Sequence, residues 1–146
     1  MNHFPIWHLA NTSYNSINLY KSDDSHYIVT KDGEWMPIIS CGIYIVINQQ
    51  LLSFFQQHLV VPVSSHPASI YDRVLSRYFE GYHRIYIENK ITPETLDKVD
   101  HAGAKIWCHE SSGGIFITSA LKSALEQSDV KGVETHPGFS GYGGNI

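Results

Sequence analysis

Apolar residues along this chain come in short runs whose lengths and spacing are typical of strands and short helices. Residues 43–47 (IYIVI) form a β-branched run that predicts a strand. Residues 48–57 (NQQLLSFFQQ) then predict a helix, because Leu51, Leu52 and Phe55 recur at helical spacing and the Asn48 side chain can cap the first turn. Residues 59–63 (LVVPV) predict a strand at a sheet edge, where a proline without an N–H is tolerated.

A similar series of elements returns near the end of the chain. Residues 115–117 predict a strand, Thr118 or Ser119 can cap a helix with Leu121, Ala124 and Leu125 on one face, and residues 130–135 predict another strand. An offset of 70 residues aligns the two segments without a gap, down to the pairs His66-Pro67 and His136-Pro137. We interpret residues 43–67 and 113–137 as an internal duplication of one strand–helix–strand unit. Shared secondary structure alone would explain the matched apolar positions, but it explains the His-Pro pairs less well.

The remaining segments give less distinct signals. We expect a short helix over residues 70–79 that buries Val74, Leu75 and Phe79, and a helix that begins at Thr92 and ends near Gly103. Further strands are predicted at residues 27–30, 84–88 and 105–108. We expect the rest of residues 1–34 to be irregular or a loose hairpin, and the glycine-rich tail, residues 138–146, to be mobile.

Together these elements predict a single α+β domain, residues 1–146, with short helices on a mixed β-sheet. The length is that of one domain, 42% of the residues are hydrophobic, and no run approaches the length of a membrane span. The first residues lack the pattern of a secretory signal, so we expect a cytoplasmic location. Pro62 on an edge strand would discourage edge pairing and favour a monomer.

Few residue patterns in the chain point to catalysis or to a cofactor. The two cysteines, Cys41 and Cys108, lie in apolar segments and are expected to be reduced and buried, although a disulfide between them stays open. Cys108-His109-Glu110 contains metal-binding residue types, but neighbours on a strand point to opposite faces. The nucleophile elbow, the phosphate-binding loop and the zinc-protease motif are all missing from the sequence. We therefore expect no catalytic residues, no metal site and no cofactor.

The nine histidines leave one alternative open. A histidine-dependent hydrolase would need two histidines and a cation at one cleft, for which His83 with Arg84, or His101 with Lys105, are the candidate pairs. His66 and His136 would converge on one site if the two units were related by a pseudo-two-fold axis. Otherwise each histidine simply ends an equivalent strand.

Charge and tyrosine content favour a protein partner. The net charge of −4 and the lack of a basic stripe argue against nucleic acid. Predicted loops near the N-terminus carry acids and tyrosines, which suit an interface with a basic cleft on a partner; a solvated loop surface is the alternative. The candidate binding residues are Tyr14, Tyr20, Asp23, Asp24, Asp32 and Glu34.

One segment resembles a known family. Residues 114–134 (GIFITSALKSALEQSDVKGVE) are similar to the C-terminal signature of bacterial immunity proteins that accompany polymorphic toxins. Trp35-Met36-Pro37 and the unit after it look like a weaker, earlier copy in that family, although Pro62 stands where the second unit has Gly132. The resemblance covers residues 35–137 and implies a protein that binds a cognate toxin and blocks it. A regulatory or adaptor module with another protein partner is the second hypothesis.

Overall fold

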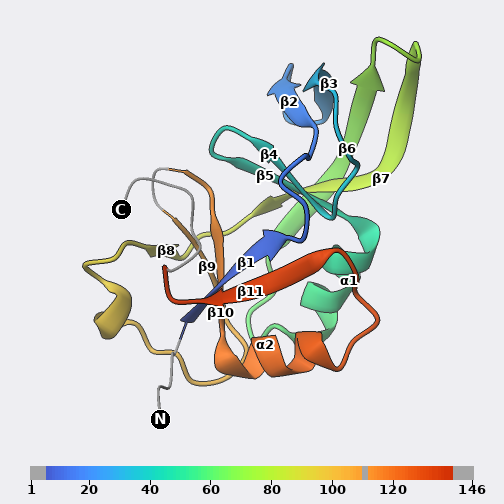
Figure 1. Ribbon diagram of the computed structural model, residues 1–146. Coiled ribbons are helices and arrows are strands. Elements are labelled where there is room, and N and C mark those ends of the chain that lie inside the picture. Colours follow the sequence, from blue (N-terminus) through green and yellow to red (C-terminus); the bar gives the residue numbers. More distant parts are fainter. Residues whose placement is uncertain (1–5, 110–111, 140–146) are drawn as a thin grey trace.

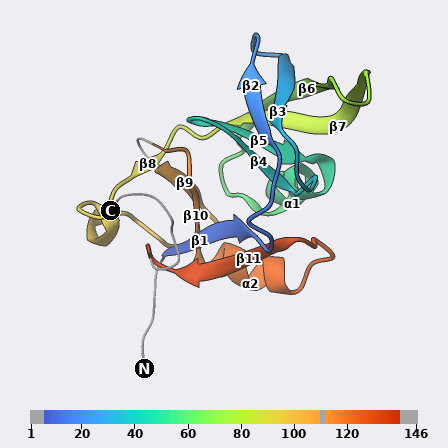
Figure 2. The same ribbon diagram turned by 45° about the horizontal axis from the view of Figure 1, so that its top comes forward.

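The computed structural model describes residues 6–109 and 112–139. Within these residues, eleven strands form two sheets and are joined by two α-helices and one 3-10 helix (Figures 1 and 2). The strands are β1 (Ile6–Asn11), β2 (Asn18–Lys21), β3 (His26–Lys31), β4 (Ile38–Cys41), β5 (Tyr44–Asn48), β6 (Ser64–Asp72), β7 (Arg77–Tyr86), β8 (Lys90–Ile91), β9 (Ile106–His109), β10 (Ile115–Thr118) and β11 (Val133–Pro137). The helices are α1 (Gln49–His58), α2 (Ser119–Glu126) and the 3-10 helix η1 (Leu96–Lys98). The predicted α+β class with mixed sheets and short helices is confirmed.

The larger sheet has six strands in the order β2-β3-β6-β7-β5-β4. Its pairs are antiparallel except for β3 with β6, which run parallel. The sheet curls so that β2 and β4, its two edges, come into contact. Buried apolar side chains from these strands meet on its concave face, among them Leu19, Tyr27, Ile39, Val46 and Ile70. We call this unit the curled sheet.

The smaller sheet has five strands in the order β11-β1-β10-β9-β8. Strand β1 lies between β10 and β11 and runs antiparallel to both, so a strand from the N-terminal part of the chain is interior to this sheet. Beyond β11, the Gly138 N–H donates to the Ile6 carbonyl over 2.8 Å, and the Phe139 ring packs against Phe116. Residues 138 and 139 thus contact the smaller sheet, residues 140–146 lie outside the described part of the chain, and the expected mobility of the tail stays a prediction.

Both helices pack into the main hydrophobic core between the two sheets. Helix α1 begins where predicted, because the Asn48 side chain accepts a hydrogen bond from the Leu51 N–H over 2.9 Å. Leu51, Leu52 and Phe55 are buried as expected, and the core also takes in Leu121 and Leu125 of α2. No helix among residues 6–109 and 112–139 is long and apolar enough to cross a membrane.

The largest difference from the sequence prediction is at residues 70–79, which form the hairpin of β6 and β7 rather than a helix. Asp72 is buried, and its Oδ1 accepts from the N–H groups of Val74 and Leu75, which closes the turn. Ser76 has a left-handed φ of 52° there. Val74 and Leu75 are consequently 77% and 57% exposed instead of buried. In Figure 1 this hairpin projects beyond the rest of the molecule at the upper right.

Three smaller corrections concern element bounds. Residues 59–63 are not a strand, because the Leu59 N–H still bonds to the Phe55 carbonyl of α1 and pairing resumes only at Ser64. Pro62 therefore lies outside the sheets, and its edge position no longer supports the predicted monomer. The helix expected from Thr92 is reduced to η1, and the last predicted strand begins at Val133. The segment expected to be irregular contains β1 and β2, whereas β3 corresponds to the strand predicted at residues 27–30.

The two proposed repeat units share one strand arrangement. In each, one strand leads into a helix and the helix leads to a second strand (β5–α1–β6 and β10–α2–β11). Another strand, β7 or β1, lies between these two in the sheet. The central residues of corresponding strands are in the same register: Val46–Arg84–His66 in the curled sheet and Phe116–His8–His136 in the other. The predicted offset of 70 residues relates Val46 to Phe116 and His66 to His136. This agreement is consistent with duplication, whose common origin stays a prediction.

Candidate functional site

A row of large side chains crosses four strands of the curled sheet on its outer face. Tyr20 of β2 is opposite Ile28 of β3, Ile28 is opposite Tyr71 of β6, and Tyr71 is opposite Tyr78 of β7. We call Tyr20, Ile28, Tyr71 and Tyr78 the tyrosine row. Residues that are directly opposite each other on paired strands project their side chains to the same face of the sheet. The ladder register therefore places all four of these side chains on one face.

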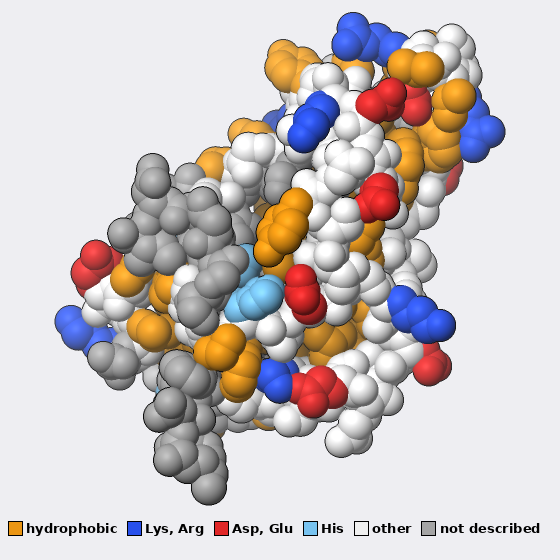
Figure 3. Space-filling view, viewed as in Figure 1, with side chains coloured by type: hydrophobic (Ala, Val, Ile, Leu, Met, Phe, Trp, Pro, Cys, Tyr) orange, Lys and Arg blue, Asp and Glu red, His pale blue; other side chains and the backbone are white. Residues whose placement is uncertain are grey.

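The tyrosine row is open to solvent. Tyr20 and Tyr78 are 62% and 60% exposed, and the Tyr71 and Tyr78 ring centroids are 4.9 Å apart. The exposed Val74 and Leu75 continue the apolar surface onto the β6–β7 turn. Figure 3 shows hydrophobic side chains gathered at this projecting end of the molecule, together with basic and acidic ones. Contiguous exposed apolar surface of this kind is typical of binding sites.

Arginine side chains gather near the β6–β7 turn, where Arg77 projects from the face of β7 opposite to Tyr78. All three arginines of the chain, Arg73, Arg77 and Arg84, fall within residues 73–84. Arg73 and Arg77 are exposed beside the β6–β7 turn, and the Arg77 guanidinium lies 4.3 Å from the centre of the Phe79 ring. Arginine and tyrosine are the residue types that most often dominate the energy of protein interfaces. The turn therefore has both the exposure and the composition of a protein-binding surface.

The six binding residues predicted from the sequence fall into two groups. Tyr20, Asp23 and Asp24 lie at or beside the turn of the β2–β3 hairpin, and only Tyr20 belongs to the tyrosine row. Tyr14, Asp32 and Glu34 lie near the other end of that hairpin, where Tyr14 is 87% exposed and borders a cavity of about 350 Å³. Whether any of the six contacts a partner stays a prediction.

Asp23 is engaged within its own turn. Its Oδ1 accepts from the N–H groups of Ser25 and His26 at 2.8 and 2.9 Å, and it also contacts the His26 ring. The hydrogen bond from Ser25 is the main reason that the pKa of Asp23 is lowered. This carboxylate therefore shapes the β2–β3 turn, as aspartate commonly does in tight turns.

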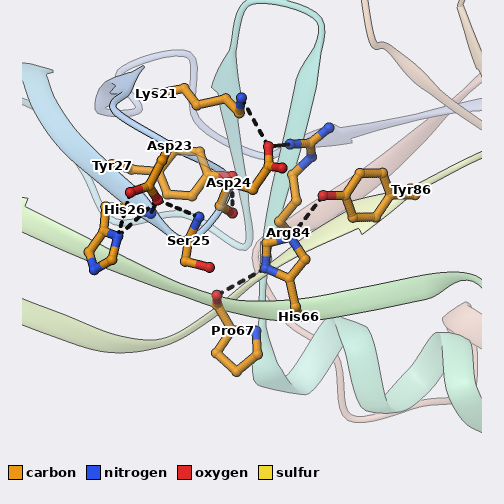
Figure 4. Close-up of polar contacts among 10 residues, drawn as sticks. All are labelled: Lys21, Asp23, Asp24, Ser25, His26, Tyr27, His66, Pro67, Arg84 and Tyr86. Carbon is orange, nitrogen blue, oxygen red and sulfur yellow. Dashed lines mark hydrogen bonds and ion pairs between the residues drawn. The ribbon is translucent and has the colours of Figure 1, made fainter.

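Asp24 reaches back over the end of the curled sheet (Figure 4). Its Oδ1 lies 2.9 Å from Lys21 Nζ and 3.6 Å from Arg84 Nη1. The hydrogen bond from Lys21 is the first cause of the lowered pKa of Asp24. Arg84 is buried at 8% exposure with its guanidinium between two rings, 4.5 Å from the centre of Tyr44 and 4.2 Å from that of Tyr86.

The histidine pairs considered for hydrolysis do not assemble a common cleft. His83 and Arg84 project from opposite faces of β7, and His83 Nε2 contacts Gln49 Oε1 at 2.6 Å. His101 is exposed, while Lys105 pairs with Asp100 at 2.9 Å. His66 and His136 belong to different sheets, where His66 Nε2 contacts the Tyr86 hydroxyl and His136 lies near Glu134.

Neither cysteine takes part in a disulfide; both are buried, free thiols as predicted. Lys90 Nζ lies 3.1 Å from the Cys108 sulfur, and His109 Nδ1 contacts Ser112 Oγ instead of sharing a ligand site with Cys108. Glu110, the third residue of that candidate metal-binding run, is outside the described residues. In the described part of the chain, no three histidine, cysteine or acidic side chains are grouped so that they could hold a metal ion.

Comparison with protein-family models, curated proteins and solved structures finds no significant match to this chain. Two members of the tyrosine row, Tyr71 and Tyr78, were not predicted as binding residues, because the sequence of residues 70–79 predicts a helix. The missed signal was the alternation of Ala68, Ile70 and Asp72 inward with Tyr71 outward.

Proposed function

We propose that this chain is a binding protein whose docking surface is the tyrosine row together with the β6–β7 turn. The observation that carries the proposal is the continuous row of Tyr20, Ile28, Tyr71 and Tyr78 across four paired strands, with its two end tyrosines more than half exposed. Tyrosine provides a large contact area and loses little conformational entropy on binding. Because the strands are paired on both sides of β3 and β6, much of this surface is already organised before a partner arrives.

The partner that we propose is a cognate bacterial toxin that acts in the cytoplasm, so that the chain serves as its immunity protein. The resemblance of residues 35–137 to toxin-associated immunity proteins supports this choice. In this proposal the chain catalyses nothing and protects the cell by covering the toxin's active site. The exposed Arg73 and Arg77 beside the turn would face acidic groups on the toxin.

The test is a rescue experiment with the product of the neighbouring gene. We expect this product to stop growth when it is expressed alone, and co-expression of the full chain to restore growth. Purified proteins should form a stoichiometric complex, with an affinity measured by titration calorimetry. A partner that binds without being toxic would favour the adaptor hypothesis, and failure of the neighbouring product to bind would contradict the immunity proposal.

Two matched variants then locate the surface. Val74→Asp and Tyr78→Ala should each weaken binding by about 30-fold or more, as expected when a central contact of about 2 kcal/mol is lost. Val61→Asp is the control, because Val61 is 70% exposed, similar to the 77% of Val74, but lies outside both the row and the β6–β7 turn. Circular dichroism must show that all three variants remain folded. Equal affinities for Val74→Asp and Val61→Asp would exclude this surface.

A further inference from the structure

Arg84 differs from the other two arginines because it is buried in the end of the curled sheet. Its side chain is 10% exposed and its guanidinium lies between Tyr44 and Tyr86. Stacking satisfies the faces of a guanidinium, but its N–H groups point outward in its plane and still require acceptors. The hydrogen bond of 2.8 Å between Tyr86 and His66 holds one of the two rings in place.

The acceptors around Arg84 are incomplete. The Tyr27 hydroxyl interacts with the guanidinium, but Nε and Nη1 are buried and have no hydrogen-bond partner within the accepted geometry among the described residues. The carboxylate of Asp24 is 3.6 Å from Nη1, which is too far for a hydrogen bond, and lies closer to Lys21 at 2.9 Å. A buried charged donor without an acceptor is costly, so in a native protein it calls for a missing partner.

Two cations therefore converge on one carboxylate. Lys21 and Arg84 carry two positive charges, and Asp24 supplies one negative charge from a turn in which its side chain is 65% exposed. Lys21 also lies over the Tyr44 ring, 4.7 Å from its centre, so the same tyrosine contacts both cations. The excess positive charge and the free in-plane donors are complementary to an oxyanion.

We propose that Lys21 and Arg84, flanked by Tyr44 and Tyr86, form a binding site for a small oxyanion, either a carboxylate or a phosphate. Asp24 occupies this site incompletely in the free protein and moves aside with the exposed turn when the ligand enters. The ligand oxygens then accept from Arg84 and from Lys21. This site is separate from the tyrosine row, and the inference does not depend on the proposed toxin.

The chain offers a direct spectroscopic test because it contains only three arginines. We would record the arginine Nε–H resonances of the full-length, ¹⁵N-labelled protein and assign them with Arg73→Lys and Arg77→Lys. Inorganic phosphate and acetate would then be titrated separately at constant ionic strength. The wild type would be compared with Asp24→Asn, which keeps the side-chain shape and removes the competing charge.

We expect the Arg84 resonance of Asp24→Asn to shift and to saturate as anion is added. The anion concentration at half-saturation should be lower than in the wild type by about tenfold or more, because a tethered competitor has been removed. The resonances of the exposed Arg73 and Arg77 serve as internal controls and should move only weakly, without saturation. Phosphate binding more tightly than acetate would assign the site to phosphate ligands, and the reverse order to carboxylates. An Arg84 resonance of Asp24→Asn that does not saturate with either anion would overturn the proposal, and the backbone amide spectrum verifies that this variant is folded.

Discussion

His8 should make this protein lose stability as the pH falls. The side chain lies in β1, is 9% exposed, and packs with a ring-centroid distance of 5.2 Å to Phe116. Burial, followed by the nearby His136, lowers the pKa of His8 from 6.5 to about 4. The folded protein therefore keeps His8 neutral at pH values where the unfolded chain already binds a proton. Because only the unfolded state takes up this proton in that pH range, acidification favours unfolding and the free energy of unfolding decreases.

The size of the effect follows from the difference between the two pKa values. One pKa unit corresponds to 1.36 kcal/mol, so the His8 contribution that is lost amounts to about 2 kcal/mol at pH 5 and about 3 kcal/mol at pH 4. Above pH 6.5 both states are neutral at this position and the contribution is complete. Other ionisable side chains lie close by: the His136 ring centroid is 6.3 Å from that of His8, and His136 lies 3.7 Å from Glu134. A comparison of variants is therefore needed to isolate His8.

The assay is urea denaturation followed by tryptophan fluorescence between pH 4 and pH 8. His8→Phe replaces the ring by one that does not titrate, and we expect its unfolding free energy to fall by about 3 kcal/mol less than that of the wild type across this range. Any hydrogen bond lost with the imidazole shifts the whole curve but leaves its slope unchanged. His101→Gln is the control, because His101 is exposed, and it should follow the wild type. Parallel curves for the wild type and His8→Phe would refute the reasoning.

Two further predictions concern the core and the start of α1. Phe55 is fully buried in the main core, so Phe55→Ala should lower the free energy of unfolding by about 3–5 kcal/mol. Gln56→Ala, on the exposed face of the same helix, is the control and should change it by less than about 0.5 kcal/mol. A loss below about 1 kcal/mol for Phe55→Ala would contradict the packing. Asn48→Ala removes the acceptor for the Leu51 N–H and should lower the free energy of unfolding by about 1 kcal/mol, measured by urea denaturation. Asn48→Asp keeps an acceptor at this position and should retain most of the stability. Equal losses for the two variants would show that the cap is unimportant.

Local signals in the sequence predicted the elements that local interactions determine. The strand and helix over residues 44–58 were identified because Asn48 caps its own helix and the apolar residues repeat at helical spacing. The β6–β7 hairpin was missed for a different reason. Pro67 cannot donate to a ladder, and His66 before it was expected to end a strand, yet Pro67 pairs with His83 inside β6. Pairing with β3 and β7 outweighs the local preference of these residues, and a single sequence contains no measure of that gain.

The candidate site was predictable only in part. Tyr20 was identified because tyrosines and acids cluster in the first 34 residues, but its row neighbours Tyr71 and Tyr78 lie about fifty residues further along the chain. Only the ladder register brings them together. Arg84 was expected in a strand, and β7 does contain it. Its burial between two tyrosine rings depends on the way the sheet curls, which no periodicity in the sequence expresses.

The position of β1 between β10 and β11 has a consequence for the order in which the chain can fold. The hydrogen bond from the Trp7 indole to Ser119 Oγ joins residues 112 positions apart, and the pairing of Trp7 with Pro137 spans a still longer loop. Closing so long a loop has a high entropic cost that must be met before any of its contacts form. The β6–β7 hairpin, in contrast, forms from neighbouring residues. The curled sheet can therefore assemble early, while β10 and β11 wait with unpaired edges until β1 enters between them.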